Sequence, residues 1–204
     1  MKLEAKARNM LLAYHRTGYK PEQVEASLEA DMRRIEIIVR KGLGRKPVGR
    51  KRVLDIGCGI GLASMAVHGY FGNKAEYVLL DKDAVDDKPK GFYHGKADGF
   101  GSSGCLEQAV EFLTSNGVED VSCVDISREP FPAGKFNVII STLSCGFHYP
   151  VSTYAAQIKA AIRPSGIVVL DVRREHMNDA VRSLGEPDMV YEDGAKHNTC
   201  VWTF

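Results

Sequence analysis

Three glycines separated by single residues are the feature of this sequence that most directly indicates chemistry. Gly57, Gly59 and Gly61 follow a short apolar run at residues 53–56, which is typical of a strand buried on both faces. Glycine allows a sharp turn and lets a ligand touch the backbone. Residues 62–67 then predict a helix whose first N–H groups point toward such a ligand. The stretch predicts a site for a nucleotide-shaped cofactor.

Asp55, two residues before the first glycine, helps to identify the ligand. Dinucleotide-binding turns have the spacing G-x-G-x-x-G and hold a pyrophosphate at the helix N-terminus. Here the spacing is G-x-G-x-G, and a carboxylate at Asp55 would repel a pyrophosphate but suits a cationic group such as an ammonium. A dehydrogenase is therefore a distant interpretation, which a test of NAD binding would check.

Later parts of the chain supply the elements that must position this turn. Four further apolar runs predict strands, at residues 77–81, 121–126, 136–141 and 167–171. The first of them ends in Asp81, 24 positions after Gly57, where an acid can accept hydrogen bonds from two ribose hydroxyls. Residues 162–166, with a proline and a glycine, predict the end of a helix. Residues 189–192 and 197–204, joined by Asp-Gly, predict a hairpin.

The alternation of strands and helical patterns favours an α/β fold with a mostly parallel sheet covered on both faces. Helical patterns occupy residues 105–115, 151–162 and 175–184. The first forty residues predict two more helices, each with one apolar face. One face carries Leu3, Ala7, Met10, Leu11 and Tyr14, and the other Val24, Leu28, Met32, Ile35 and Val39.

The stretch from Asp55 to Gly61 closely resembles motif I of the class I S-adenosylmethionine-dependent methyltransferases. Asp81 and Asp125 stand where that family carries acids facing the ribose and the adenine amino group, whereas Asn137 replaces an acid found in many members. The resemblance runs from about residue 50 to the C-terminus. It implies a Rossmann-like seven-stranded sheet with an antiparallel C-terminal strand. Residues 50–204 would form this domain and residues 1–49 a helical extension.

The resemblance also implies S-adenosylmethionine as the cofactor and a set of residues that contact it. These are Asp55, Gly57, Cys58, Gly59, Gly61, Asp81, Lys82, Asp125, Ile126 and Ser141. The N-terminal helices, including Tyr14 and Tyr19, would lie over the cofactor or only cover the sheet. Irregular residues 83–104 would form either a lid, with Phe92, Tyr93 or Phe100 closing over the ligands, or a plain insertion.

Methyl transfer to a hydroxyl needs a base, and the loop after the fourth strand is the place to look for it. This loop, residues 141–150, lacks the Asn/Asp-Pro-Pro-Tyr pattern of enzymes that methylate exocyclic amines of DNA. His148 is the candidate general base, because imidazole is partly unprotonated at neutral pH. Its alternative role is a hydrogen bond within the loop. Cys145 is a possible nucleophile, but such a cysteine is more often buried and inert.

Three functions remain open at this stage. Residues 112–118 and 147–150 resemble a subgroup of sugar or polysaccharide methyltransferases, which supports a hydroxyl of a small molecule or sugar as the acceptor. A non-catalytic methyltransferase-like module that binds the cofactor is the second possibility. The third is methylation of RNA or DNA, held by a cationic strip. The strip comprises Arg40, Lys41, Arg45, Lys46, Arg50, Lys51 and Arg52.

Composition argues against several of the other classes. A net charge of +1 and a pI of about 7.7 disfavour a nucleic-acid-binding domain, for which a pI above about 9 is common. Five cysteines without a close pair favour a reducing cytoplasm and no structural zinc, and the six histidines lack metal-ligand spacing. No apolar run approaches the roughly 20 residues of a membrane span. We therefore expect a cytoplasmic protein without a metal.

Overall fold

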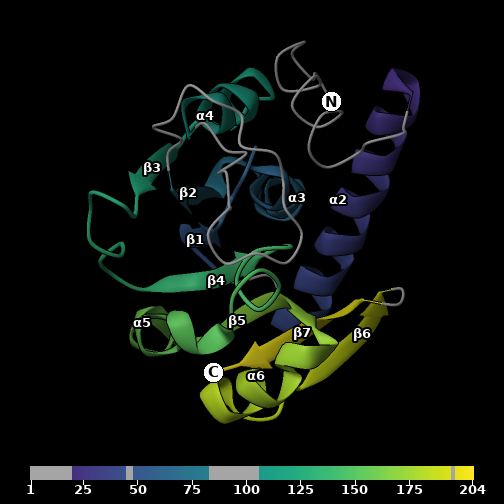
Figure 1. The fold of residues 1–204 in the computed structure, drawn as a ribbon. Helices are drawn as coiled ribbons and strands as arrows, with labels where there is room; N and C mark the ends of the chain where they lie inside the picture. The colour runs from purple at the N-terminus through teal and green to yellow at the C-terminus, as the bar shows by residue number, and fades with distance from the viewer. Residues whose placement is uncertain (1–19, 45–47, 83–105, 194–195) are drawn as a thin grey trace.

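The computed structural model describes residues 20–44, 48–82, 106–193 and 196–204, which form a seven-stranded sheet with helices on both faces (Figure 1). The strand order is β3-β2-β1-β4-β5-β7-β6. Strand β7 runs antiparallel to both of its neighbours, and the pairs formed by β1 to β5 are parallel. The predicted Rossmann-like fold is confirmed. The strands are β1 (Lys51–Ile56), β2 (Ala75–Asp81), β3 (Val121–Asp125), β4 (Phe136–Ser141), β5 (Ile162–Arg173), β6 (Met189–Asp193) and β7 (His197–Thr203).

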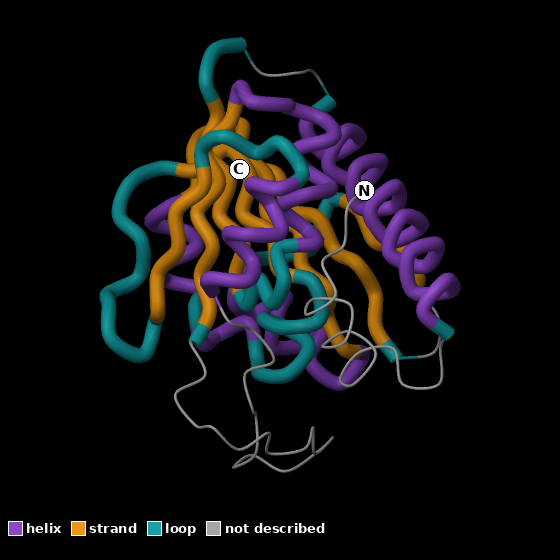
Figure 2. The backbone as a smooth tube through the Cα atoms, turned by 90° about the horizontal axis from the view of Figure 1, so that it is seen from above, coloured by secondary structure: helices purple, strands orange, loops and turns teal. Residues whose placement is uncertain are grey.

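The helices form one layer on each side of the sheet (Figure 1), and Figure 2 shows the strands from above, lengthwise and side by side. Helices α2 (Pro21–Leu43), α3 (Leu62–Phe71) and α4 (Leu106–Ser115) cover one face, and α5 (Ala155–Ala161) and α6 (Met177–Leu184) cover the other. The described residues also contain short 3-10 turns at Gly72–Lys74, Val151–Thr153 and Arg174–His176.

Alternate residues of each central strand enter opposite cores, because successive side chains of a strand point to opposite faces. Val53 and Val138 pack with α2, α3 and α4, whereas Leu54 and Ile139 pack with α5 and α6. All four are fully buried. This explains why the central strands are continuous apolar runs rather than alternating ones.

Helix α2 confirms one of the two predicted N-terminal helices. Val24, Leu28, Ile35 and Val39 are buried against the core, and the helix packs on α3, β5 and β7. The first predicted helix, with Tyr14 and Tyr19, lies outside the described residues. The division into residues 1–49 and 50–204 stays a prediction.

The chain after β4 differs from the single helix predicted for residues 151–162. The 3-10 turn Val151–Thr153 comes first, Tyr154 then leaves the helical region with φ −124° and ψ 8°, and α5 follows. Helix α5 ends at Ala161, where residues 162–166 predict a helix end, and these residues then form the first part of β5, which pairs with β4 through Phe136 and Ile162. The register shifts before the next pair, so that these residues loop out within the strand. The C-terminal hairpin is confirmed.

The sheet order reverses direction between β1 and β4, because β2 and β3 lie on one side of β1 while β4 and β5 lie on the other. In open α/β sheets, ligands bind outside the carboxyl ends of the strands at such a switch point. The loops that follow β1 and β4 are the two that meet there.

Candidate active site

The glycine turn after β1 carries three residues in the left-handed region, but each needs glycine for a different reason. Gly57, Gly59 and Gly61 have φ of 66°, 54° and 82°. A Cβ on Gly57 would collide with the Ser144 side chain, and one on Gly61 would lie 3.2 Å from Leu113 Cδ1 of α4. A Cβ on Gly59 would meet no atom of the described residues within 4 Å. Among the described residues, the Gly59 position is therefore the least crowded of the three, and it is the one where a ligand can lie on the backbone.

Asp81, at the end of β2, connects the loop after β2 to the glycine turn after β1. Its Oδ2 accepts a hydrogen bond from Gly59 N at 2.9 Å, and its Oδ1 accepts one from Lys82 N at 2.7 Å. The neighbouring Leu80 carbonyl accepts a hydrogen bond from Gly57 N at 2.6 Å. Each carboxylate oxygen can accept more than one hydrogen bond. Asp81 is half-buried at the edge of the turn.

Asp55 is placed differently from Asp81, because it lies inside the fold. It is 1% exposed, and its Oδ2 accepts hydrogen bonds from Ser64 N (3.1 Å) and Ser64 Oγ (2.8 Å) of α3. Its buried Oδ1 has no hydrogen-bond partner in the described part of the chain. Burial raises the pKa of Asp55 to about 7, against the opposing effect of the Ser64 hydrogen bonds. Asp55 thus joins β1 to α3 and leaves one acceptor atom beneath the glycine turn.

The loop after β4 reaches the same turn from the other side. Ser141 is fully buried, and its hydroxyl donates to Ile56 O at 2.6 Å and accepts from Cys145 N at 2.9 Å. Ser144 Oγ and Tyr149 Oη are 3.1 Å apart, and both lie within 4 Å of the position that a Gly57 Cβ would occupy. The end of β1 and the loop after β4 are therefore in direct contact.

Asp125, at the end of β3, stabilises the loop that follows this strand. Its Oδ1 accepts hydrogen bonds from Ser127 N (2.9 Å) and Ser127 Oγ (2.6 Å), and its Oδ2 lies 3.4 Å from Arg128 Nε. The next backbone N–H, that of Ile126, donates to Asp81 O at 3.0 Å. The loops after β2 and β3 are joined by this bond, which brings Asp125 to the same edge as Asp81.

Three aromatic rings contact one another near the carboxyl end of β4. Tyr149 and Tyr154 meet edge to face with ring centroids 5.8 Å apart, and Phe131 lies 5.8 Å from Tyr154. Burial raises the pKa of both phenols, and the Asp81 charge raises each further. Tyr149 Oη also lies 3.8 Å from the position that a Gly57 Cβ would occupy, so this group of rings begins beside the glycine turn. They form an aromatic wall, defined here as Phe131, Tyr149 and Tyr154.

These features together fit a nucleoside bearing an amino acid. An open backbone position at Gly59, a carboxylate beside it and an aromatic wall are what a ribose and a base require. A family model described as "Methyltransferase domain" matches residues 24–200. The chain belongs to this methyltransferase family. With the fold above, membership confirms the predicted class I S-adenosylmethionine-dependent methyltransferase and S-adenosylmethionine as its cofactor.

Solved structures agree on the fold of this methyltransferase. A SAM dependent methyltransferase from Aquifex aeolicus is 13% identical, with a TM-score of 0.57, covering 91% of this chain and 98% of that one. A ribosomal protein L11 methylase from Lactobacillus delbrueckii subsp. bulgaricus is 16% identical (TM-score 0.56, covering 85% and 79%). A precorrin-6y C5,15-methyltransferase from Geobacter metallireducens is 11% identical (TM-score 0.56, covering 83% and 86%). Identities this low show the fold alone. No curated protein matches the chain.

The structure brings most of the predicted cofactor residues of the methyltransferase to one edge, although their contacts with the cofactor stay predictions. Gly59 and Asp81 are joined by a hydrogen bond at the turn, whereas Asp55 and Ser141 are buried and support it from within. His148 lies on the loop after β4, half-buried, with its backbone N–H bonded to Ser144 O at 2.8 Å. The predicted lid, with Phe92, Tyr93 and Phe100, falls outside the described residues.

Sequence reasoning missed Ser144 and the aromatic wall. Their residues stand in three separate stretches, so only the folded chain shows that they share an edge with Asp81. The close approach of Ser144 to Gly57 had one sequence signal, the glycine itself. That signal does not distinguish a neighbouring side chain from a bound ligand, and the prediction assigned the glycines to a sharp turn and a ligand.

The two cysteines nearest the site are unreactive. Burial raises the pKa of Cys145 to about 12, and burial together with Asp81 raises the pKa of Cys58 well above its usual value. Because the thiolate is the nucleophile, neither thiol is activated. Cys58 can contribute only its backbone and its bulk.

Most described side chains of the cationic strip bond to other groups of the protein. Arg52 forms a two-pronged pair with Glu76, and Arg50 pairs with Asp120. Arg40 bonds Glu36 at 2.7 Å, and Lys51 is buried with its Nζ donating to Val48 O. Arg45 and Lys46 lie outside the described residues. Lys51 and Arg52 of the strip belong to β1.

Within residues 20–44, 48–82, 106–193 and 196–204, the structure shows no group of three or more metal-binding side chains. None of the described helices is long and apolar enough to cross a membrane.

Proposed function

We propose that this methyltransferase transfers a methyl group from S-adenosylmethionine to a hydroxyl of a small molecule or sugar. The observation that carries the proposal is the contact between the loop after β4 and the glycine turn, where Ser144 packs on Gly57. That loop also carries His148, four residues further on. A base on this loop is close to the switch point, where the methyl donor binds in such sheets.

The roles divide between the two sides of the switch point. The Asp81 carboxylate and the backbone at Gly59 would hold the ribose and amino-acid parts of the cofactor, and Asp125 with the aromatic wall would hold the base. The bound cofactor supplies an electrophilic methyl group. The chain's own residues orient the acceptor and exclude water. His148 would accept the proton of the acceptor hydroxyl.

Two observations support a hydroxyl acceptor over a nucleic acid. The loop at residues 141–150 lacks the motif of exocyclic amine methylases, and the described arginines of the cationic strip have carboxylate partners. The resemblance of residues 112–118 and 147–150 to sugar or polysaccharide methyltransferases adds support.

The test has two stages. Calorimetry with S-adenosylhomocysteine measures the cofactor site, and transfer of a labelled methyl group to pools of hydroxyl compounds then measures catalysis. His148→Ala should lower kcat by about 10²- to 10⁴-fold, the usual contribution of a general base, with unchanged S-adenosylhomocysteine affinity. His68→Ala, a histidine of α3 bonded to Asn73, is the matched control.

Two results would count against the proposal. Intact S-adenosylhomocysteine binding without transfer to any pool would identify a non-catalytic module. Full activity of His148→Ala would remove His148 from the role of base.

A further inference from the structure

The carboxyl end of β5 carries a cluster of titratable side chains on the side of the switch point away from β2 and β3. Because β7 is antiparallel, its first residue pairs with the last residue of β5, so His197 lies across from Arg173. Both surround the ring of Phe147, with the Arg173 guanidinium carbon 4.4 Å and the His197 ring 5.3 Å from its centroid. His148 meets the same ring edge-on at 5.1 Å. The proposed base and Arg173 thus share one aromatic neighbour.

Arg173 is held firmly but is incompletely satisfied. Its backbone N–H donates to Gly146 O at 3.0 Å, and its guanidinium lies over Phe147. Its buried Nε has no hydrogen-bond partner among the described residues, although the side chain as a whole is 27% exposed. A buried donor without a partner is costly, and an anion is the partner that a guanidinium binds best.

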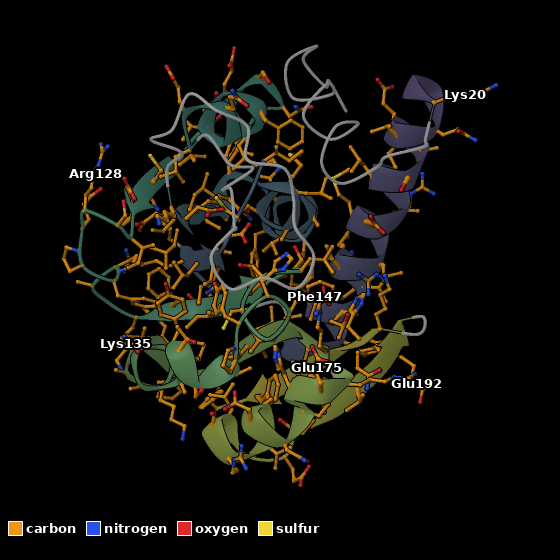
Figure 3. The ribbon with its side chains drawn as sticks, in the orientation of Figure 1. Lys20, Arg128, Lys135, Phe147, Glu175 and Glu192 are labelled. Carbon is orange, nitrogen blue, oxygen red and sulfur yellow. The ribbon has the colours of Figure 1, made fainter. Side chains whose placement is uncertain are left out.

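Two carboxylates lie at this end of β5, but neither bonds the Arg173 Nε. Asp171 is 1% exposed, and its oxygens accept hydrogen bonds from Thr199 Oγ1 (2.6 Å) and Leu143 N (3.2 Å). Glu175 Oε1 lies 3.3 Å from Arg173 Nη1, but the Glu175 side chain is 66% exposed. An exposed pair of this kind contributes little and rearranges easily. Figure 3 shows Phe147 and Glu175 in the same region, beside β5 and β7.

We propose that Arg173 is the anion-binding subsite for the methyl acceptor, which is a hydroxyl compound that also carries a carboxylate or phosphate. The inference rests on the proposed function and deepens it. The guanidinium binds the anionic group, and its contact with Phe147 fixes its orientation before the acceptor arrives. His148, on the next edge of the same ring, then meets the hydroxyl.

A panel of matched acceptors tests this substrate class: glucose, glucuronate and glucose 6-phosphate, and catechol with dihydroxybenzoate. With labelled S-adenosylmethionine, the anionic members should be methylated with a higher kcat/KM than their neutral counterparts. Arg173→Gln should lower kcat/KM for the anionic members on the order of 10- to 100-fold, the value of a charge-assisted pair, mainly through KM. Activity toward neutral members should not change. Arg174→Gln, an exposed arginine one position further, is the control.

Titration with inorganic phosphate separates failure of the subsite from failure of the proposed function. Phosphate should bind the S-adenosylhomocysteine complex of the wild type and of Arg174→Gln, and bind Arg173→Gln at least about tenfold more weakly. Equal binding by all three overturns the subsite, as does a preference for neutral acceptors that Arg173→Gln leaves unchanged. If no acceptor is methylated, the proposed function fails, and the phosphate titration still decides on Arg173.

Discussion

The two sides of the switch point are built by different kinds of contact. On the cofactor side, the Asp81 carboxylate binds the backbone N–H groups of Gly59 and Lys82, so the side chain and the turn determine each other's positions. On the side of β5 and β7, the proposed acceptor side, Asp171 depends on other side chains. Thr199 Oγ1 donates to it at 2.6 Å and accepts from Arg34 Nη1 at 2.9 Å.

This difference matches a difference in function: cofactor binding is general to the family, whereas the proposed choice of acceptor is specific. A turn held through backbone groups tolerates many sequences, provided that glycines and an acid are present. The chain from Arg34 through Thr199 to Asp171 joins α2, β7 and β5 and ends at Leu143 N of the loop after β4. Replacing any side chain in this series of hydrogen bonds removes a partner of the residue that follows it. Acceptor choice can therefore vary while the cofactor site stays the same.

The largest effect is expected at Gly57, where the two sides touch. Gly57→Ala places a methyl group against Ser144 at a positive φ, so both overpacking and backbone strain oppose it. We expect a loss of about 2 to 4 kcal/mol in the free energy of unfolding and no measurable S-adenosylhomocysteine binding. Gly59→Ala meets no neighbour and should lose only about 1 kcal/mol while still weakening the cofactor. Urea unfolding and calorimetry measure both, and equal stability of the two variants would contradict this contrast.

Asp55, on the cofactor side, should make stability depend on pH. Burial raises its pKa from 3.8 unfolded to about 7 folded, so between these values the folded protein holds a proton that the unfolded chain has lost. Stability should therefore fall as pH rises from about 4 to 7, by up to a few kcal/mol, and level off above 7. Asp55→Asn removes this titration. The measurement is urea unfolding of both proteins across pH 4 to 8; parallel curves would show that Asp55 titrates normally in the fold.

The sequence predicts the cofactor side of the switch point better than the side of β5 and β7. Local patterns reveal β1, the glycine turn and Asp81, because their spacing along the chain sets their spacing in the fold. The partners of Asp171 are invisible in the sequence, since Arg34 and Thr199 are 165 positions apart. The predicted single helix at residues 151–162 was wrong because the break at Tyr154 carries no proline or glycine to signal it. The role of Ser141 was also out of reach, because its backbone partners come from β1 and from its own loop.

Asp81→Asn should weaken the cofactor without affecting the acceptor loop. The amide keeps one acceptor oxygen but loses the charge that strengthens bonds to Gly59 N and to ligand hydroxyls. We expect S-adenosylhomocysteine affinity to fall on the order of 10- to 100-fold. Glu76→Gln, in the same strand and paired with Arg52 far from the turn, is the control and should bind normally. Undiminished affinity in Asp81→Asn would place the ribose elsewhere.

Thr199→Val should have the smallest effect, and one confined to the acceptor side. It keeps the shape of the side chain but removes the hydroxyl between Arg34 and Asp171, so we expect a loss of about 1 to 2 kcal/mol in the free energy of unfolding. Amide hydrogen exchange at residues 142–149 should quicken, because Leu143 N depends on an Asp171 that is no longer held. The exposed Thr203 of the same strand provides the control variant, Thr203→Val. The affinity for S-adenosylhomocysteine should stay within about twofold of the wild type, because Thr199 and Asp171 have no hydrogen bond to the glycine turn. If that affinity fell as far as in Asp81→Asn, the two sides would be one coupled unit, and acceptor choice could not vary independently of cofactor binding.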